Sequence, residues 1–191
     1  MTDIVAPYGK LNTSTKLRNI KLTLSELDLG GYEKFVQGGF NDDWLPIWMQ
    51  QAGYNVYYTG KLYNSLNVNN YNKPYPKGFN GSDFLVDPGT YNYYNPTYQR
   101  NKDPPIHYTG KTGNYTTDLL WEKSQSFLDE ARQSNLPFFL TMAPVAPHNG
   151  GGPRPEGASA MGPVPAAKYV NYFKEEQVPR GKNFNPDKVS G

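Results

Sequence analysis

The chain has 191 residues, enough for one domain and short for two. Only 37% of the residues are hydrophobic, while Gly and Pro together make up about 19% where about 12% is usual. We therefore expect a thin core with many turns and loops, which excludes a bundle of long helices. The net charge of +2 provides no field for nucleic acid, and no apolar run approaches the ~20 residues of a membrane span. Without cysteine, disulfides, thiolate metal sites and a cysteine nucleophile are excluded within these residues.

Composition changes sharply along the chain. Residues 10–29 are rich in Lys, Leu, Thr and Ser and lack aromatic residues and proline, and their apolar positions fit a helix or a strand. Residues 149–191 are rich in Gly and Pro with little periodicity, so we expect them to be rich in loops. The first residues lack a basic segment followed by an apolar one, so they predict no signal peptide.

Residues 41–61 predict a helix followed by a strand. Apolar residues from Trp44 to Ala52 recur at helical spacing, Pro46 falls in or near the first turn, and Gly53 is a suitable left-handed stop. The β-branched and aromatic residues 55–59 then favour a short strand, which ends at Gly60-Lys61.

Residues 116–143 predict a second unit of the same kind. Thr116 or Thr117 is expected to cap a helix that carries Asp118 in its first turn. The continuous apolar run 138–143 follows, as expected for a strand covered on both faces. Two such units predict a layered α/β fold with at least partly parallel strands. Two strands are too few for this sheet, so the others must be irregular or missing.

Lys61 and His148 follow the two predicted strands. In open α/β sheets, ligands gather beyond the carboxyl ends of strands. Taken singly, each residue is more simply interpreted as a solvated or turn residue. Together they suit an anionic ester, because a lysine is a fixed cation and a histidine can hold or donate a proton near neutral pH. They supply neither a nucleophile nor a metal cage.

The acidic candidates have simpler interpretations than catalysis. Asp42 and Asp43 resemble a metal pair, but helix capping explains them more simply. Asp83 and Asp87 flank a short apolar run and are interpreted as surface turn residues. His107 has no suitably spaced partner for a zinc site.

The stretch from Tyr54 to Tyr98 contains ten tyrosines among many asparagines. Flat rings with amide donors suit sugar binding, and packing of the loops is the alternative. Asn80 and Asn114 stand in glycosylation sequons, which matter only if the chain is secreted.

Several blocks occur in an order and at a spacing that match a known family. These blocks are residues 44–54, 57–64, 75–84, 116–118, 137–140, 143–148, 179–180 and 183–187. The first two resemble the "GY…GK" block of sulfatases, and the segments from 116 to 148 are similar to their "TD…PFF…APH" block. The resemblance is closest to fungal-type arylsulfatases of the GK-x-x-N branch. It implies part of an alkaline-phosphatase-like mixed sheet flanked by helices, incomplete and rich in loops.

The resemblance also implies a chemistry, the hydrolysis of sulfate esters. The family uses a formylglycine made from Cys or Ser in a C/S-x-P-x-R motif, with a calcium ion that helps to bind the sulfate. By resemblance, Lys61 contacts the sulfate, His148 lies near the ester oxygen and assists the leaving group, and Asn64 binds substrate. Tyr63 stands where many sulfatases have a histidine, which leaves no residue assigned as the base that regenerates the aldehyde.

The sequence departs from the family at several points. It has no C/S-x-P-x-R motif, and the calcium ligands have no counterparts. We therefore expect residues 1–191 to be a partial catalytic domain with little or no activity alone. Residues 10–29 read as an atypical insertion, from a retained intron or a mispredicted gene. The half-sheet should expose core faces such as Phe138-Phe139 and make the isolated chain aggregate.

The resemblance suggests a partner and a location, and it leaves alternatives. A small sulfate ester or a sulfated glycan is the expected ligand, and the family suggests secretion. One alternative is a non-catalytic carbohydrate-binding module that uses the loops rich in Tyr and Asn. The other is a phosphoester hydrolase of the same superfamily.

Overall fold

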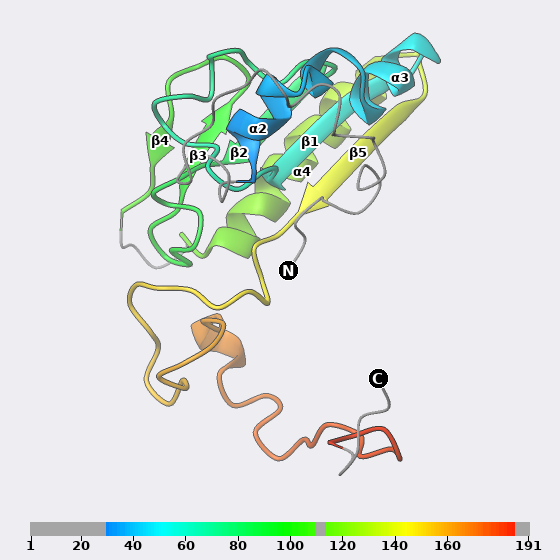
Figure 1. Cartoon of the computed structure of the whole chain (residues 1–191). Coiled ribbons are helices and arrows are strands. Elements are labelled where there is room, and N and C mark those ends of the chain that lie inside the picture. Colours follow the sequence, from blue (N-terminus) through cyan, green and yellow to red (C-terminus); the bar gives the residue numbers. More distant parts are fainter. Residues whose placement is uncertain (1–29, 110–113, 186–191) are drawn as a thin grey trace.

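The computed structural model describes residues 30–109 and 114–185, which form a five-stranded sheet with the strand order β4-β3-β2-β1-β5 (Figure 1). The strands are β1 (Asn55–Lys61), β2 (Gly81–Leu85), β3 (Thr97–Arg100), β4 (Ile106–His107) and β5 (Phe138–Ala143). β1 pairs in parallel with β2 and β5, and β3 and β4 continue antiparallel. The expected α/β fold with partly parallel strands is confirmed, and β2, β3 and β4 are strands that the sequence did not reveal.

Helices cover both faces of this sheet, namely α2 (Tyr32–Gln37), α3 (Leu45–Gln51) and α4 (Thr116–Gln133). Two short 3-10 helices, η2 (Phe40–Asp42) and η3 (Ala167–Tyr169), complete the described helices, and η3 lies away from the sheet (Figure 1). Phe127 of α4 packs on Tyr57 of β1, with 5.4 Å between ring centroids. Tyr32 of α2 belongs to a different buried cluster, with Phe84 of β2. Figure 1 shows α4 and α2 on opposite faces of the sheet.

The helix expected after residue 41 is α3, but its start differs from the prediction. Trp44 is the N-cap, and no side chain caps the helix. The Asp43 carboxylate instead accepts a hydrogen bond from the Trp48 indole at 2.6 Å, and Asp42 pairs with Lys77. The capping role assigned to Asp42 and Asp43 is therefore wrong, because both carboxylates find side-chain partners in place of the helix N–H groups.

The second predicted helix is α4, and here too the cap differs. Tyr115 is the N-cap, and no side chain makes a capping hydrogen bond. Thr116 lies inside the helix and is buried, with its hydroxyl 3.1 Å from that of Tyr98. Asp118 lies in the first turn as predicted. The role expected of Thr116 or Thr117 is thus wrong, because tertiary contact with β3 draws the Thr116 hydroxyl away from the helix end.

β5 has the predicted bounds but is not covered on both faces. Phe138 and Met142 keep 46% and 43% of their surface exposed. Leu140, which shares their face of the strand, packs against the cluster around Phe127 of α4. The expectation of full cover is wrong because β5 is the edge strand of the described sheet, where α4 reaches only part of it.

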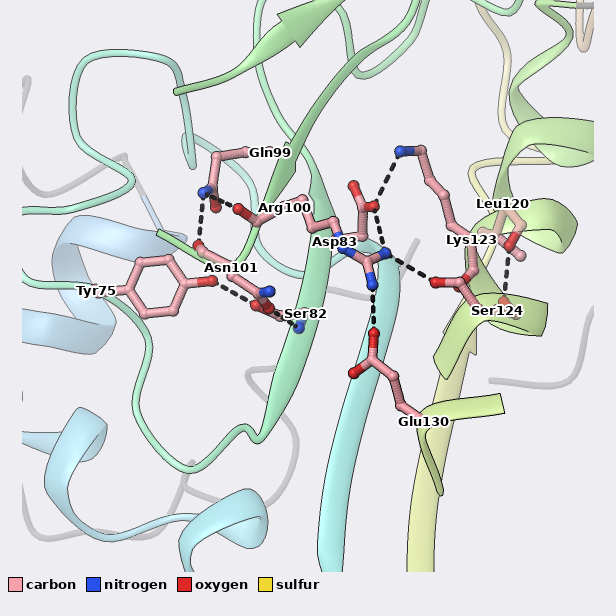
Figure 2. A network of polar contacts seen from close by, with 11 residues as sticks. Tyr75, Ser82, Asp83, Gln99, Arg100, Asn101, Leu120, Lys123, Ser124 and Glu130 are labelled. Atoms are coloured by element: carbon pink, nitrogen blue, oxygen red, sulfur yellow. Dashed lines mark hydrogen bonds and ion pairs between the residues drawn. The ribbon is translucent and has the colours of Figure 1, made fainter. Parts of the chain in front are cut away.

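The interpretation of Asp83 as a surface turn residue is also wrong. β2 already begins at Gly81, so Asp83 lies within the strand, and its side chain is fully buried. Lys123 of α4 donates to the carboxylate at 2.9 Å, and a guanidinium nitrogen of Arg100 lies 3.5 Å from it (Figure 2). Arg100 also pairs with Glu130 at 2.6 Å. This network of alternating charges joins β2, β3 and α4.

Replacing Lys123 by Met removes the nearer cation from this buried carboxylate. We expect Lys123→Met to lower the free energy of unfolding by about 3 kcal/mol at pH 7, because Asp83 keeps only Arg100 as a cationic partner. Lys102→Met, at an exposed lysine in the turn after β3, is the matched control and should change stability by less than about 0.5 kcal/mol. Denaturant unfolding of both variants measures the difference.

The loss should depend on pH. Burial raises the pKa of Asp83, and the charges of Lys123 and Arg100 oppose that rise. Lys123→Met therefore raises this pKa further. A raised carboxyl pKa costs stability only where the unfolded chain is ionised, so the penalty grows as the pH rises above about 4 and disappears as the pH falls back towards it. A penalty that stayed constant between pH 7 and pH 4 would contradict a buried ionised carboxylate.

The open flank at β5 predicts self-association of the isolated chain. Edge strands pair readily with other strands, and a charged residue on the edge blocks this. We expect sedimentation velocity to show oligomers of the unmodified chain and a larger monomer fraction for Met142→Lys. Met161→Lys, at a methionine that is 82% exposed outside the sheet, should leave the distribution unchanged. A monomeric unmodified chain with a cooperative melt would refute the prediction.

Candidate functional site

Lys61 is the last residue of β1, and its position depends on the pairing of β1 with β5. The two strands are parallel, with Gly60 opposite Ala143, so both end at the same edge of the sheet. Gly60 has a φ of +105°, and a Cβ there would lie 2.0 Å from the Ala143 carbonyl oxygen. Only glycine fits this approach. The chain leaves β5 at this edge and reaches His148 five residues later.

Tyr91 joins the two residues that the sequence singled out. The Lys61 ammonium donates to the Tyr91 hydroxyl at 2.7 Å and lies 4.8 Å from the centroid of its ring. The His148 ring lies against the same ring, with 4.6 Å between centroids and 38° between planes. The Tyr91 hydroxyl in turn donates to the Asn64 side chain at 3.3 Å. Lys61, Asn64 and His148 therefore gather around one phenol.

Backbone contacts hold His148 beside Tyr91. The Tyr93 hydroxyl donates to the His148 carbonyl at 2.6 Å, and the Gly151 amide donates to the Tyr91 carbonyl at 3.0 Å. The His148 Nδ1 lies 2.6 Å from the Asn149 carbonyl oxygen, which can only accept. Nδ1 therefore carries a proton. The exchangeable proton of this exposed imidazole is then the one on Nε2.

Arg154 organises the loop that follows His148. Its guanidinium donates to the carbonyls of Gly150, Ser159 and Gly162 at 2.8–2.9 Å, and to that of Pro163 at 3.4 Å. Because one guanidinium donates to carbonyls at both ends of the loop, it holds the loop closed without a helix or a strand. Within residues 149–185, the structure places the short helix η3 (Ala167–Tyr169).

The local charge of the site is positive. Within residues 30–109 and 114–185, no Asp or Glu forms an ion pair with Lys61. Its ammonium is half-buried and bound to a neutral phenol. A cation without a carboxylate partner attracts an anion by about 4 kcal/mol at 4 Å for an effective dielectric constant of 20. The arrangement suits an oxyanion close to a histidine.

Tyr63, which stands where the sequence comparison expected a histidine, lies among aromatic rings. Its ring centroid is 4.6 Å from that of Phe35, 6.1 Å from that of Trp44 and 6.2 Å from that of Tyr32. It belongs to the partly buried rim of the cluster around Tyr32. A phenol in this environment is explained by packing.

Tyr91 was not found from the sequence. It is one of ten tyrosines between residues 54 and 98, and nothing in its local pattern separates it from the others. The one available signal was its place near Gly89, in a segment without helical or strand periodicity. Its role depends on contacts with β1 and with the loop after β5, which are distant in the sequence.

The other tyrosines of this stretch serve the fold. Tyr93 and Tyr98 are almost fully buried, and their hydroxyls donate to backbone carbonyls. The Tyr94 hydroxyl donates to the Pro165 carbonyl and ties the later loop to this stretch. Packing of the loops therefore accounts for these rings better than a platform for sugars.

The remaining candidates lie apart from these contacts. His107 is exposed on β4, with Nδ1 2.9 Å from the Thr97 hydroxyl. Asp87 is partly buried just after β2 and pairs with Asn67 in a β-bridge. Asn80 is exposed, and its side-chain oxygen accepts from the Val56 amide at 2.8 Å. Asn114 is partly buried and donates to the Thr109 carbonyl.

No cage for a metal ion is built in the part of the chain that the structure describes, since no three His, Asp or Glu side chains gather there. Among the described carboxylates, the fully buried one is that of Asp83, which is bound by Lys123 and Arg100, and cationic partners do not suit a calcium ligand. The described residues therefore do not fit the calcium ion that the resemblance implies. No described helix is long and apolar enough to cross a membrane.

Comparison with known proteins identifies similar sequences. The family model described as Sulfatase matches residues 13–184. An arylsulfatase of Volvox carteri is 33% identical over 158 residues, and one of Chlamydomonas reinhardtii is 30% identical over the same length. Each alignment covers 80% of this chain and 24% of the relative. An N-acetylglucosamine-6-sulfatase of Capra hircus is 30% identical over 145 residues, covering 73% of this chain and 22% of the relative. The chain thus spans about a quarter of the length of these relatives.

Gly60→Ala tests the close approach that positions Lys61. We expect the free energy of unfolding to fall by about 2 kcal/mol or more, because the added Cβ meets a backbone carbonyl and the φ is positive. Gly181→Ala, where a Cβ meets open space, is the control. Hydrogen exchange should show faster exchange in β1 and β5 for Gly60→Ala alone. Unchanged protection there would mean that the strands tolerate the added carbon.

Proposed function

The chain belongs to the sulfatase family, and we propose that it forms part of a sulfuric ester hydrolase in which Lys61 and His148 act on a sulfate ester. The meeting of these two side chains at Tyr91 carries the proposal, because strands far apart in the sequence bring a cation and a proton carrier to one edge of the sheet. The sequence contains no C/S-x-P-x-R motif, so the chain alone is expected to be inactive.

Lys61 has the first role, binding the sulfate group. Its ammonium is fixed at the end of β1 and carries a charge that no described carboxylate neutralises. A charged donor held in place before substrate arrives stabilises charge on the ester oxygens with little reorganisation. Asn64, bound to the same phenol, is placed to add an amide donor from its side-chain nitrogen.

His148 has the second role, proton transfer at the ester oxygen. Cleavage of the sulfur–oxygen bond leaves negative charge on the alcohol or phenol oxygen, and a proton from Nε2 would neutralise it as the bond breaks. The Asn149 carbonyl fixes the Nδ1 proton, so the imidazole presents Nε2 for this step. A phenol beneath the ring holds its orientation.

Formylglycine and calcium are the parts of the family's chemistry that these residues do not supply. The C/S-x-P-x-R motif does not occur in the sequence, and the described acidic residues form no cage. Loss of the nucleophile from such a catalytic unit typically costs several orders of magnitude in rate. Residues 1–191 are therefore proposed as part of a larger catalytic domain. The suggested insertion at residues 10–29 lies outside the described residues.

Substrate, location and modification follow as parts of the same proposal. A small sulfate ester or a sulfated glycan is the proposed ligand, in line with relatives named arylsulfatase and N-acetylglucosamine-6-sulfatase. The GK-x-x-N motif at Gly60–Asn64 supports the fungal-type branch. A secreted protein with glycans on Asn80 and Asn114 is proposed from the family and from the sequons, with Asn80 at an exposed position.

Titration with inorganic sulfate tests the site without needing turnover. We expect sulfate to shift the ring signals of His148 in NMR spectra, and Lys61→Met to weaken binding about tenfold or more, because a charged hydrogen bond is lost. His107, the only other histidine, should not respond. Lys102→Met, which removes an equal charge from an exposed turn, should bind as the unmodified chain does at constant ionic strength.

Inorganic phosphate provides the comparison with the second class of ester. If the chain is part of a sulfate hydrolase, Lys61→Met should weaken sulfate binding at His148. Weak competition by phosphate would not change this expectation. Phosphate binding that is tighter than sulfate binding by tenfold or more would favour the phosphoester alternative instead. If neither sulfate nor phosphate shifts the NMR signals of His148, there is no anion site at this edge of the sheet.

A further inference from the structure

Tyr91 is in contact with every residue that the proposed chemistry uses in this chain. Its hydroxyl accepts from Lys61 at 2.7 Å and donates to Asn64 at 3.3 Å, so both hydrogen-bonding capacities of the phenol are directed at the site. Its ring carries the His148 imidazole at 4.6 Å.

The backbone around Tyr91 is itself firmly held. Its carbonyl accepts from the Gly151 amide at 3.0 Å, and Asn92 forms a β-bridge with Gly151. A Cβ at Gly150 would lie 2.6 Å from both the Tyr91 carbonyl and the Tyr93 ring, so the two loops are in close contact. The phenol therefore stands on a rigid support that also fixes the start of the loop after His148.

A lysine needs such support to act as a precise anion ligand. Its four rotatable bonds let the ammonium sample many positions, and ordering them costs conformational entropy when an anion binds. A hydrogen bond from the ammonium to a phenol oxygen in the free protein orders the lysine side chain before the anion binds, so less conformational entropy is lost on binding. Because the phenol is neutral, it leaves the charge of Lys61 available to the ester, which a carboxylate partner would not.

We propose that Tyr91 is a positioning residue of the sulfate site, which orders the Lys61 ammonium through its hydroxyl and the His148 imidazole through its ring. This inference rests on the proposed function, because it assigns the two side chains that Tyr91 orients to binding and proton transfer. Tyr91 acts through Lys61 and His148 and makes no bond to the reacting atoms.

The two functions of Tyr91 can be separated by substitution. Tyr91→Phe removes the hydroxyl and keeps the ring, whereas Tyr91→Leu removes both. In the free protein, the ring current of Tyr91 should displace the ring proton signals of His148, and this displacement should persist in Tyr91→Phe and disappear in Tyr91→Leu. The signals of His107, which contacts Thr97, should stay unchanged in both variants.

Sulfate titration then measures the contribution of the hydroxyl. We expect Tyr91→Phe to raise the dissociation constant of inorganic sulfate about fivefold, because one ordering hydrogen bond to the ammonium is lost. Tyr94→Phe is the matched control, because it removes a hydroxyl that donates to the Pro165 carbonyl in the same loop. Tyr94→Phe should bind sulfate as the unmodified chain does, even if its melting temperature falls.

The outcomes distinguish this inference from the proposed function. Sulfate binding that requires Lys61 but is equal in the unmodified chain and in Tyr91→Phe would overturn the role of the hydroxyl and leave the sulfate site standing. His148 signals that are unaffected by Tyr91→Leu would overturn the role of the ring. An unmodified chain that does not bind sulfate at His148 would overturn both the proposed function and the positioning role. A lower melting temperature in Tyr91→Phe with unchanged sulfate affinity would mean that the Tyr91 hydroxyl contributes to stability and not to the sulfate site.

Discussion

The parallel pairing of β1 with β5 is the constraint on which the arrangement depends. It brings the carboxyl ends of two strands to one edge of the sheet, although more than half of the described chain separates them. The pairing is close enough at Gly60 and Ala143 that no side chain fits between them. Lys61 follows directly on one strand, and the turn to His148 follows on the other. A cation and an imidazole therefore share a site without any local sequence that connects them.

The tyrosines between residues 54 and 98 hold the side chains at this edge of the sheet in place. Their buried rings fill the space between β3, α4 and the loop after β5, and the hydroxyls of Tyr93 and Tyr98 donate to the backbone carbonyls of His148 and Thr116. Tyr93 holds the backbone of His148, and Tyr91 lies between the histidine and Lys61. In a chain with few aliphatic residues, phenols supply both apolar area and polar partners, which explains how a thin core still fixes a loop.

The two flanks of the sheet differ in how their side chains are covered and paired. On the flank of β2 and β3, the buried Asp83 is balanced by Lys123 and Arg100, so charge is neutralised within the described residues. On the other flank, β5 carries partly exposed apolar side chains and forms the edge. The candidate site lies at the end of β1, between these flanks. The strand that ends at Lys61 therefore has on one side a strand whose buried carboxylate is paired, and on the other side an incompletely covered edge strand.

The sequence by itself determined the elements that depend on local pattern: the helix–strand units at 41–61 and 116–143, the left-handed stop at Gly53, and the family, through blocks in a fixed order. Only the tertiary structure decided which residues were buried, because burial depends on what a distant segment brings. Asp83 became a core carboxylate when α4 supplied Lys123, and β5 stayed open because the described chain gives it one neighbouring strand. Tyr91 belongs to the same class. Its sequence neighbours resemble those of nine other tyrosines, and its place between Lys61 and His148 exists only because strand pairing brings three distant segments together.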